Sequence, residues 1–179
     1  MDYLEHIFSP AKTEEERISF VANLRAHIMS DIITSPRYAD EEQFVYMDAD
    51  SIVRWEIGET ICDVSAYSRQ LEQSEELKYL ISTIRFKNTP GTRLFLQYWS
   101  HETRKLCNAS HSIMHCQTAF NRALAAATED CDALKLNFTF EPAPKGFSDW
   151  DFANDSAVWA AKGPRKTDPI FTSEAEKYA

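Results

Sequence analysis

The first periodic stretch of the chain predicts a helix from Thr13 to about Ser35, just before Pro36. Thr13 is the candidate N-cap, because Glu16 stands three residues later and completes a capping box. A proline disfavours helical backbone at the residue before it, which sets the end of the helix. Apolar residues recur every three or four positions, as on one face of a helix: Ile18, Val21, Leu24, Ile28 and Ile32. We expect this face to lie against the core.

The remaining apolar segments are either short runs, which predict strands, or longer periodic stretches, which predict helices. The strands are expected at 44–47, 80–86, 134–140 and 157–161, and the further helices at 89–106 and 113–127. Strands interleaved with helices indicate a single α/β domain with at least part of its sheet parallel. This domain is placed at residues 1–166. Residues 167–179 are polar and are expected to form a mobile tail.

Charge and composition narrow the function classes. The 179 residues include 28 acidic and 19 basic ones, a formal charge of −9, which argues against binding to nucleic acid. No apolar run approaches the ~18 residues of a membrane helix, and the first residues do not have the form of a signal peptide. The four cysteines form no C-x-x-C pair, so we expect reduced thiols in a cytoplasmic protein.

Two acidic residues directly follow the first predicted strand. Phe44 to Met47 are apolar or aromatic, and Asp48 and Asp50 come next, separated by one alanine. Side chains two apart on an extended chain point the same way, and ligands of open α/β sheets bind beyond the carboxyl ends of strands. Two such carboxylates suit Mg²⁺ or Mn²⁺. Alternatively, Asp48 caps the following turn and Asp50 is solvated.

Four stretches, in order along residues 14–166, resemble the metal-dependent, nucleotide-sugar glycosyltransferases of the GT-A fold. The segment FVYMDADSIV at 44–53 is similar to the D-x-D strand of that family. The segment TIRFKNTPGTRLFL at 83–96 is similar to its strand and helix behind the sugar pocket. Residues 117–124 (QTAFNRAL) resemble a helix of the sugar site, and 158–163 (VWAAKG) resemble its C-terminal strand and Lys-Gly loop.

The resemblance implies a GT-A-like fold, a mixed sheet flanked by helices, and a role for each matching residue. Asp50 would ligate Mn²⁺ or Mg²⁺, and Asp48 would contact the metal or the donor ribose. Gln117 would lie near the donor sugar. Lys162, with the backbone of Gly163, would neutralise the diphosphate of a UDP- or GDP-sugar as it leaves. The acceptor is unknown and no general base is identified, so retaining and inverting transfer both stay open.

Three departures from the family pattern support a second interpretation. Ala160 stands where the family often has a metal-binding histidine, and Cys116 stands where it has an aspartate before the glutamine. Only 43 residues precede Phe44, of which one predicted helix takes about half, so the βαβ unit that holds the base is expected to be incomplete. These features favour a non-catalytic binding or assembly module derived from a transferase. An open sheet edge would also favour a homo-oligomer.

Three further interpretations receive less weight. A phosphatase of the haloacid dehalogenase type also uses D-x-D, with Asp48 as the nucleophile, but Ile52 stands where that family has threonine or valine. A second acidic pair, Asp149 and Asp151, could supply a missing ligand, although a surface turn is favoured. Histidines and cysteines that could form a zinc cluster lie close together in the sequence: His101, Cys107, His111, His115 and Cys116. They lack the zincin pattern, so we favour surface and helix-end histidines.

Overall fold

A computed structural model describes residues 13–68, 79–110, 112–133, 138–144, 146–161 and 163–178 of the chain. The helices are α2 (Glu14–Asn23), α3 (Arg25–Thr34), α4 (Pro90–Ala109), α5 (His115–Ala133) and α6 (Pro169–Ala175). The strands are β1 (Gln43–Met47), β2 (Ser51–Val53), β3 (Val64–Ser68), β4 (Tyr79–Lys87), β5 (Phe140–Pro142), β6 (Ser148–Asp149) and β7 (Val158–Ala160). Short 3₁₀ turns are η1 (Pro36–Tyr38), η3 (Gly163–Thr167) and η4 (Glu176–Tyr178).

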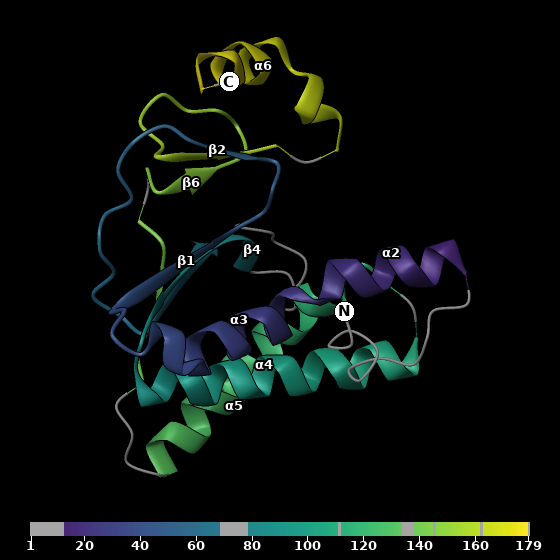
Figure 1. Ribbon diagram of the computed structural model, residues 1–179, viewed down its shortest axis with the longest axis vertical. Coiled ribbons are helices and arrows are strands. Elements are labelled where there is room, and N and C mark those ends of the chain that lie inside the picture. Colours follow the sequence, from purple (N-terminus) through teal and green to yellow (C-terminus); the bar gives the residue numbers. More distant parts are fainter. Residues whose placement is uncertain are drawn as a thin grey trace.

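The strands form two sheets that lie one above the other between helical layers (Figure 1). The larger sheet has the order β1-β4-β3-β5, with antiparallel pairs except for the parallel pair β3–β5. The smaller sheet has the order β2-β7-β6, and its β6–β7 pair is parallel. The fold is therefore mixed α/β with mixed sheets flanked by helices, and the prediction of a partly parallel sheet is confirmed.

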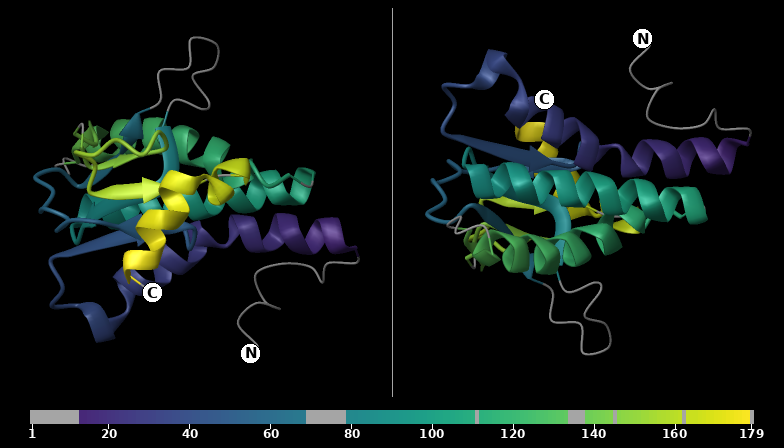
Figure 2. Two further views of the ribbon diagram at one scale, coloured as in Figure 1. Left: turned by 90° about the horizontal axis from the view of Figure 1, so that it is seen from above. Right: turned by 90° about the horizontal axis from the view of Figure 1, so that it is seen from below.

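Helices α3, α4 and α5 cover one face of the larger sheet, as Figure 2 shows from above and below. The core between them contains an aromatic cluster in which Trp99 lies against Phe86, Phe95 and Phe120. Burial of such side chains is the main favourable contribution to folding. Within the described part of the chain, no helix is long and apolar enough to cross a membrane.

The first predicted helix is present, but as two helices that meet at Leu24. The capping box of Thr13 and Glu16 is confirmed, with both of its hydrogen bonds formed. The predicted apolar face is wrong at three of its five positions, because Ile18, Val21 and Ile28 are 54%, 66% and 42% exposed, whereas Leu24 is buried. Figure 1 shows that α2 projects past the end of the sheet, so the sheet does not cover it. The buried residue of α2 near the break is polar, Asn23.

The predicted strands and helices in the centre of the chain are largely confirmed. Strands β1 and β4 and helices α4 and α5 lie where the pattern predicts them. Of the predicted strand at 134–140, residues 134–137 lie outside the described residues, and the strand observed is β5. It includes Pro142, which pairs in an outer strand where a missing N–H is tolerated.

The C-terminal segment is helical instead of an extended polar tail. Phe171 of α6 packs with Phe152 and Trp159 on the outer face of the smaller sheet. Glu174 of α6 forms an ion pair with Arg54 at 3.2 Å, and the guanidinium of Arg54 lies 3.9 Å from the centre of the Trp159 ring. Phe171 and Glu174 of α6 are both buried, so an apolar contact and an ion pair together hold this helix on the sheet.

Candidate functional site

The two aspartates of the D-x-D segment lie where the chain passes from one sheet to the other. The backbone N–H of Asp48 donates to Ser82 O at 2.9 Å, which extends the pairing of β1 with β4 by one residue. The carbonyl of Asp50 accepts from Ala161 N at 3.1 Å, next to the pairing of β2 with β7. The two acidic residues are thus fixed through their backbones to different sheets.

The carboxylate of Asp48 is nearly buried and accepts two hydrogen bonds. Its Oδ1 accepts from an Nη atom of Arg25 at 3.2 Å and from the Tyr46 hydroxyl at 2.6 Å. Burial raises the pKa of the Tyr46 phenol, so this hydroxyl stays protonated and donates. A charged and a neutral donor together hold the carboxylate in one orientation.

Arg25 is itself held firmly at the start of α3. Its Nε donates to Ala22 O at 3.1 Å, and an Nη atom also reaches Ile81 O at 3.4 Å. Its guanidinium lies 5.7 Å from the centre of the Tyr46 ring. Arg25 follows the break between α2 and α3 at Leu24 and reaches the end of β1, while the Ala22 carbonyl near the end of α2 serves as one of its acceptors.

Asp50 is paired with a residue from the other end of the chain. The Nζ of Lys166, in η3, lies 3.0 Å from Asp50 Oδ2, and the lysine side chain is 53% exposed. The turn η3 is held independently by Arg165, which donates to Trp150 O and to Asp151 Oδ1. Each aspartate of the pair therefore has a basic partner that comes from a distant segment.

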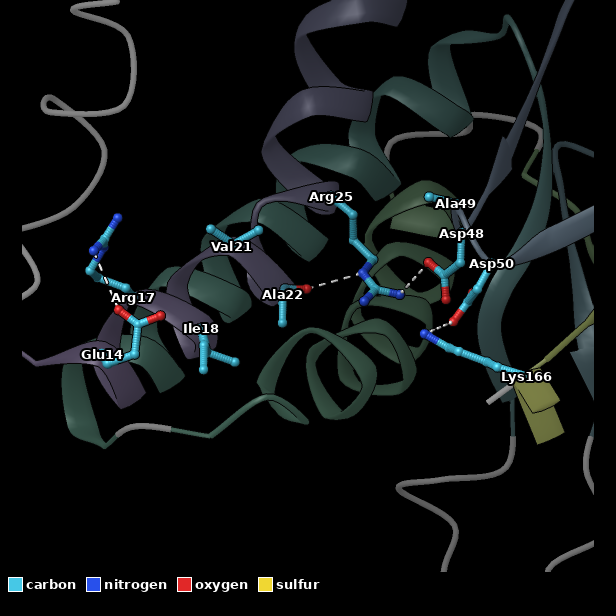
Figure 3. Close-up of a pocket in the computed structure, with 10 residues that line it drawn as sticks. All are labelled: Glu14, Arg17, Ile18, Val21, Ala22, Arg25, Asp48, Ala49, Asp50 and Lys166. Atoms are coloured by element: carbon cyan, nitrogen blue, oxygen red, sulfur yellow. Dashed lines mark hydrogen bonds and ion pairs between the residues drawn. The ribbon is translucent and has the colours of Figure 1, made fainter. Parts of the chain in front are cut away.

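A hollow of about 750 Å³ lies between α2 and the strand ends, and Arg25, Asp48, Asp50 and Lys166 are among the residues that line it (Figure 3). Figure 3 shows the carboxylates of Asp48 and Asp50 side by side, with Arg25 on one side and Lys166 on the other. The far part of the hollow follows α2, where Ile18 and Val21 present exposed apolar side chains. The strand end of the hollow is lined by charged side chains, and the α2 end by Ile18 and Val21 together with the ion pair of Glu14 and Arg17.

Gln117 does not line this hollow. It lies on α5, buried, and its amide is engaged by the first residues of β4: Oε1 accepts from Ile81 N at 3.2 Å, and Nε2 donates to Tyr79 O. Gly163 begins η3 with a φ of 55°, a left-handed conformation that glycine adopts readily. Lys162 lies outside the described residues. Of the predicted site residues, the structure brings together Asp48 and Asp50.

The two carboxylates fit a divalent cation only as part of its shell. Hard oxygen donors suit Mg²⁺ and Mn²⁺, and Mg²⁺ commonly takes one or two carboxylates and completes its shell with water and ligand phosphates. Among the described residues, no group of three or more histidine, cysteine or acidic side chains could hold a metal ion. The arrangement therefore fits a cation that shares its shell with a phosphate ligand, and does not fit a site made from protein alone.

The histidine–cysteine group and the second acidic pair, Asp149 and Asp151, do not form metal sites in the described part of the chain. Burial raises the pKa of the Cys116 thiol to about 12, and Nε2 of His115 contacts Ser110 O at 2.9 Å. His111 lies outside the described residues. Asp149 Oδ1 accepts from the backbone N–H groups of Asp151 and Ala153, the geometry of a turn. The turn interpretation of this acidic pair is the one observed.

Arg25 was missed by the sequence analysis, and Lys166 stood out only as part of a basic cluster with Lys162 and Arg165, which could contact phosphate or be solvated. Arg25 reaches an aspartate 23 residues away, and no local pattern in the sequence indicates that contact. Lys166 belongs to the basic segment after β7, where the resemblance pointed to Lys162. The run of basic residues after β7 indicates that one of them could contact a phosphate, but their spacing does not show which one.

Comparison of the chain with models of protein families, with curated proteins and with solved structures finds no match. What can be said about its activity therefore rests on the residues of the hollow.

Proposed function

We propose that the protein is a metal-dependent glycosyltransferase of the GT-A type that uses a UDP- or GDP-sugar as donor. The observation that supports this most is the joint placement of Asp48 and Asp50 in one hollow, flanked by Arg25 and Lys166. Two acidic and two basic groups in one place match a ligand that consists of a diphosphate and a divalent cation.

In this proposal each described residue has a separate task. Asp48 and Asp50 hold Mn²⁺ or Mg²⁺, which as a Lewis acid stabilises the charge on the departing diphosphate. Arg25 keeps Asp48 in place through its fixed hydrogen bonds. Lys166 supplies positive charge for the diphosphate, the role that the resemblance assigned to Lys162. Preorganised charges of this kind are the largest part of what such a transfer requires.

A non-catalytic binding module stays the second candidate, and one observation favours it. The amide of Gln117, expected at the donor sugar, is used by the backbone of β4, and the residue before it is the buried Cys116. Such a module would bind the nucleotide with its cation but would not break the sugar bond. Release of free sugar from UDP-glucose or GDP-mannose, followed over hours, separates the two functions.

The thermal stability of the protein tests the proposed site. We expect Mn²⁺ with UDP or GDP, each at about 1 mM, the upper end of usual KM values, to raise the Tm. A ligand at about 100 times its Kd adds about 2.7 kcal/mol, and for this chain length each kcal/mol raises the Tm by about 2–4 °C. The expected shift is therefore about 5–10 °C, and it requires both metal and nucleotide.

Asp50→Asn is the matching variant, since it keeps the shape of the side chain and removes its charge. It should abolish the shift, whereas Asp40→Asn, at an exposed position outside the hollow, should leave the shift unchanged. If neither nucleotide raises the Tm of the natural sequence in the presence of Mn²⁺, or if the shift persists in Asp50→Asn, the proposal is wrong.

A further inference from the structure

Arg25 and Lys166 hold the two aspartates in different ways. The Arg25 side chain is 18% exposed and is bound by two backbone carbonyls besides Asp48. The Lys166 side chain is 53% exposed, and Asp50 is the acceptor found for its Nζ. A lysine has a flexible four-carbon stem and a point charge, so it can change partners at little cost, whereas a planar arginine held by three acceptors cannot.

The position of Lys166 sets it in competition with a divalent cation. Its ammonium group lies 3.0 Å from Asp50 Oδ2, in contact with the carboxylate that a metal would use. An ammonium group and a divalent ion cannot approach one carboxylate oxygen together, because they repel each other strongly at such distances. Metal binding at Oδ2 of Asp50 therefore requires that Lys166 leave this oxygen.

A bound diphosphate would offer the ammonium group of Lys166 an alternative ion-pair partner. Lys166 lines the same hollow as both aspartates, so phosphate oxygens bound there lie within reach of its stem. The turn that carries it need not move, because η3 stays anchored by Arg165 on Trp150 O and Asp151. The exchange involves one side chain.

We propose that Lys166 transfers from Asp50 to the diphosphate when the ligand binds, and that this exchange makes the divalent cation and the nucleoside diphosphate bind cooperatively. The inference rests on the function proposed above. The cation alone binds weakly, because it displaces Lys166 without offering it a partner. The nucleotide alone would draw Lys166 away from Asp50 and leave that carboxylate without its lysine beside an anionic diphosphate. When both bind, the diphosphate accepts Lys166 and the cation takes its place at Asp50. By linkage, the cation and the nucleotide then raise each other's affinity by the same factor.

Calorimetric titration tests the exchange with the intact chain. The titrants are MnCl₂ alone, UDP or GDP alone, and MnCl₂ in the presence of saturating nucleotide, at about 0.15 M salt to screen charges that are not in contact. For the natural sequence, nucleotide should tighten Mn²⁺ binding at least about 10-fold, within the usual range of coupling between sites.

Lys166→Met removes the charge and keeps most of the stem. We expect this variant to bind Mn²⁺ alone about 5–10-fold more tightly than the natural sequence and to lose most of the gain from nucleotide. Lys105→Met is the matched control, because Lys105 pairs with Glu102 on α4 and lies outside the hollow. It should reproduce the natural affinities within about twofold.

The outcomes separate the inference from the function on which it rests. A lysine that only contacts phosphate would weaken nucleotide binding when replaced and leave the affinity for Mn²⁺ alone unchanged. That result, with nucleotide and metal still binding to the natural sequence, overturns the exchange and leaves the proposed function standing. If no variant and no condition shows Mn²⁺ or nucleotide binding, both are wrong.

Discussion

Asn23 joins the break between α2 and α3 to the start of α5, and its removal should be costly. The side chain is fully buried. Its Nδ2 donates to Ser112 O at 2.8 Å and to Ser19 O at 2.6 Å, and its Oδ1 accepts from Cys116 N at 2.6 Å. The first N–H groups of a helix have no partner within it, so Asn23 supplies the missing acceptor for α5 from another helix.

The magnitude follows from the groups that Asn23→Ala leaves behind. The Ser19 carbonyl keeps its place in the helical hydrogen-bond pattern. The buried N–H of Cys116 loses its acceptor, and the carbonyl of Ser112 keeps only a 3.4 Å bond from the N–H of His115. A buried group left unsatisfied costs about 1–3 kcal/mol. We therefore expect a loss of about 3 kcal/mol, a large fraction of the roughly 5–15 kcal/mol by which a domain is stable.

Urea unfolding followed by circular dichroism measures this loss. With an m-value of about 2 kcal/mol per M, the midpoint should fall by about 1.5 M with the slope unchanged. Asn108→Ala is the control, because Asn108 is exposed near the end of α4, and it should change the free energy of unfolding by less than about 0.5 kcal/mol. A loss below about 1 kcal/mol in Asn23→Ala would refute this account of the contact.

Two further predictions concern acid stability and the end of α2. Burial, and to a lesser degree Arg104, lowers the pKa of His27 from 6.5 to about 4. The unfolded chain therefore takes up this proton first as the pH falls below 6.5, and the natural sequence should lose about 3 kcal/mol more than His27→Gln by pH 4; parallel stability curves for the two proteins would contradict this. Replacement of the Thr13 cap by alanine should cost about 1 kcal/mol, measured as faster amide hydrogen exchange in the first turn of α2, and unchanged exchange there would show that the capping box is unimportant.

Local features of the chain predicted most of its elements. The capping box at Thr13, the apolar run of β1 and the helix that begins near Thr89 each depend on residues a few positions apart, and all three are present. Patterns of this kind are visible in a sequence because neighbouring residues satisfy one another.

Contacts between distant segments were not predictable. Periodicity indicated that Val21 faces a core, but whether a helix face is covered depends on where the helix ends relative to the sheet. The burial of Asn23 and the pairing of Arg25 with Asp48 are likewise decided by tertiary neighbours. The identity of the two acidic residues was visible in the sequence, and which basic groups lie beside them was not.

The passage of the chain between the sheets has a mechanical consequence. Because the backbone of Asp48 is bonded to one sheet and that of Asp50 to the other, the spacing of their carboxylates changes whenever the sheets slide or tilt against each other. A ligand that binds both carboxylates at once would link the two sheets to each other. Ligand binding at this small polar site would thereby reduce the motion of the smaller sheet relative to the larger one.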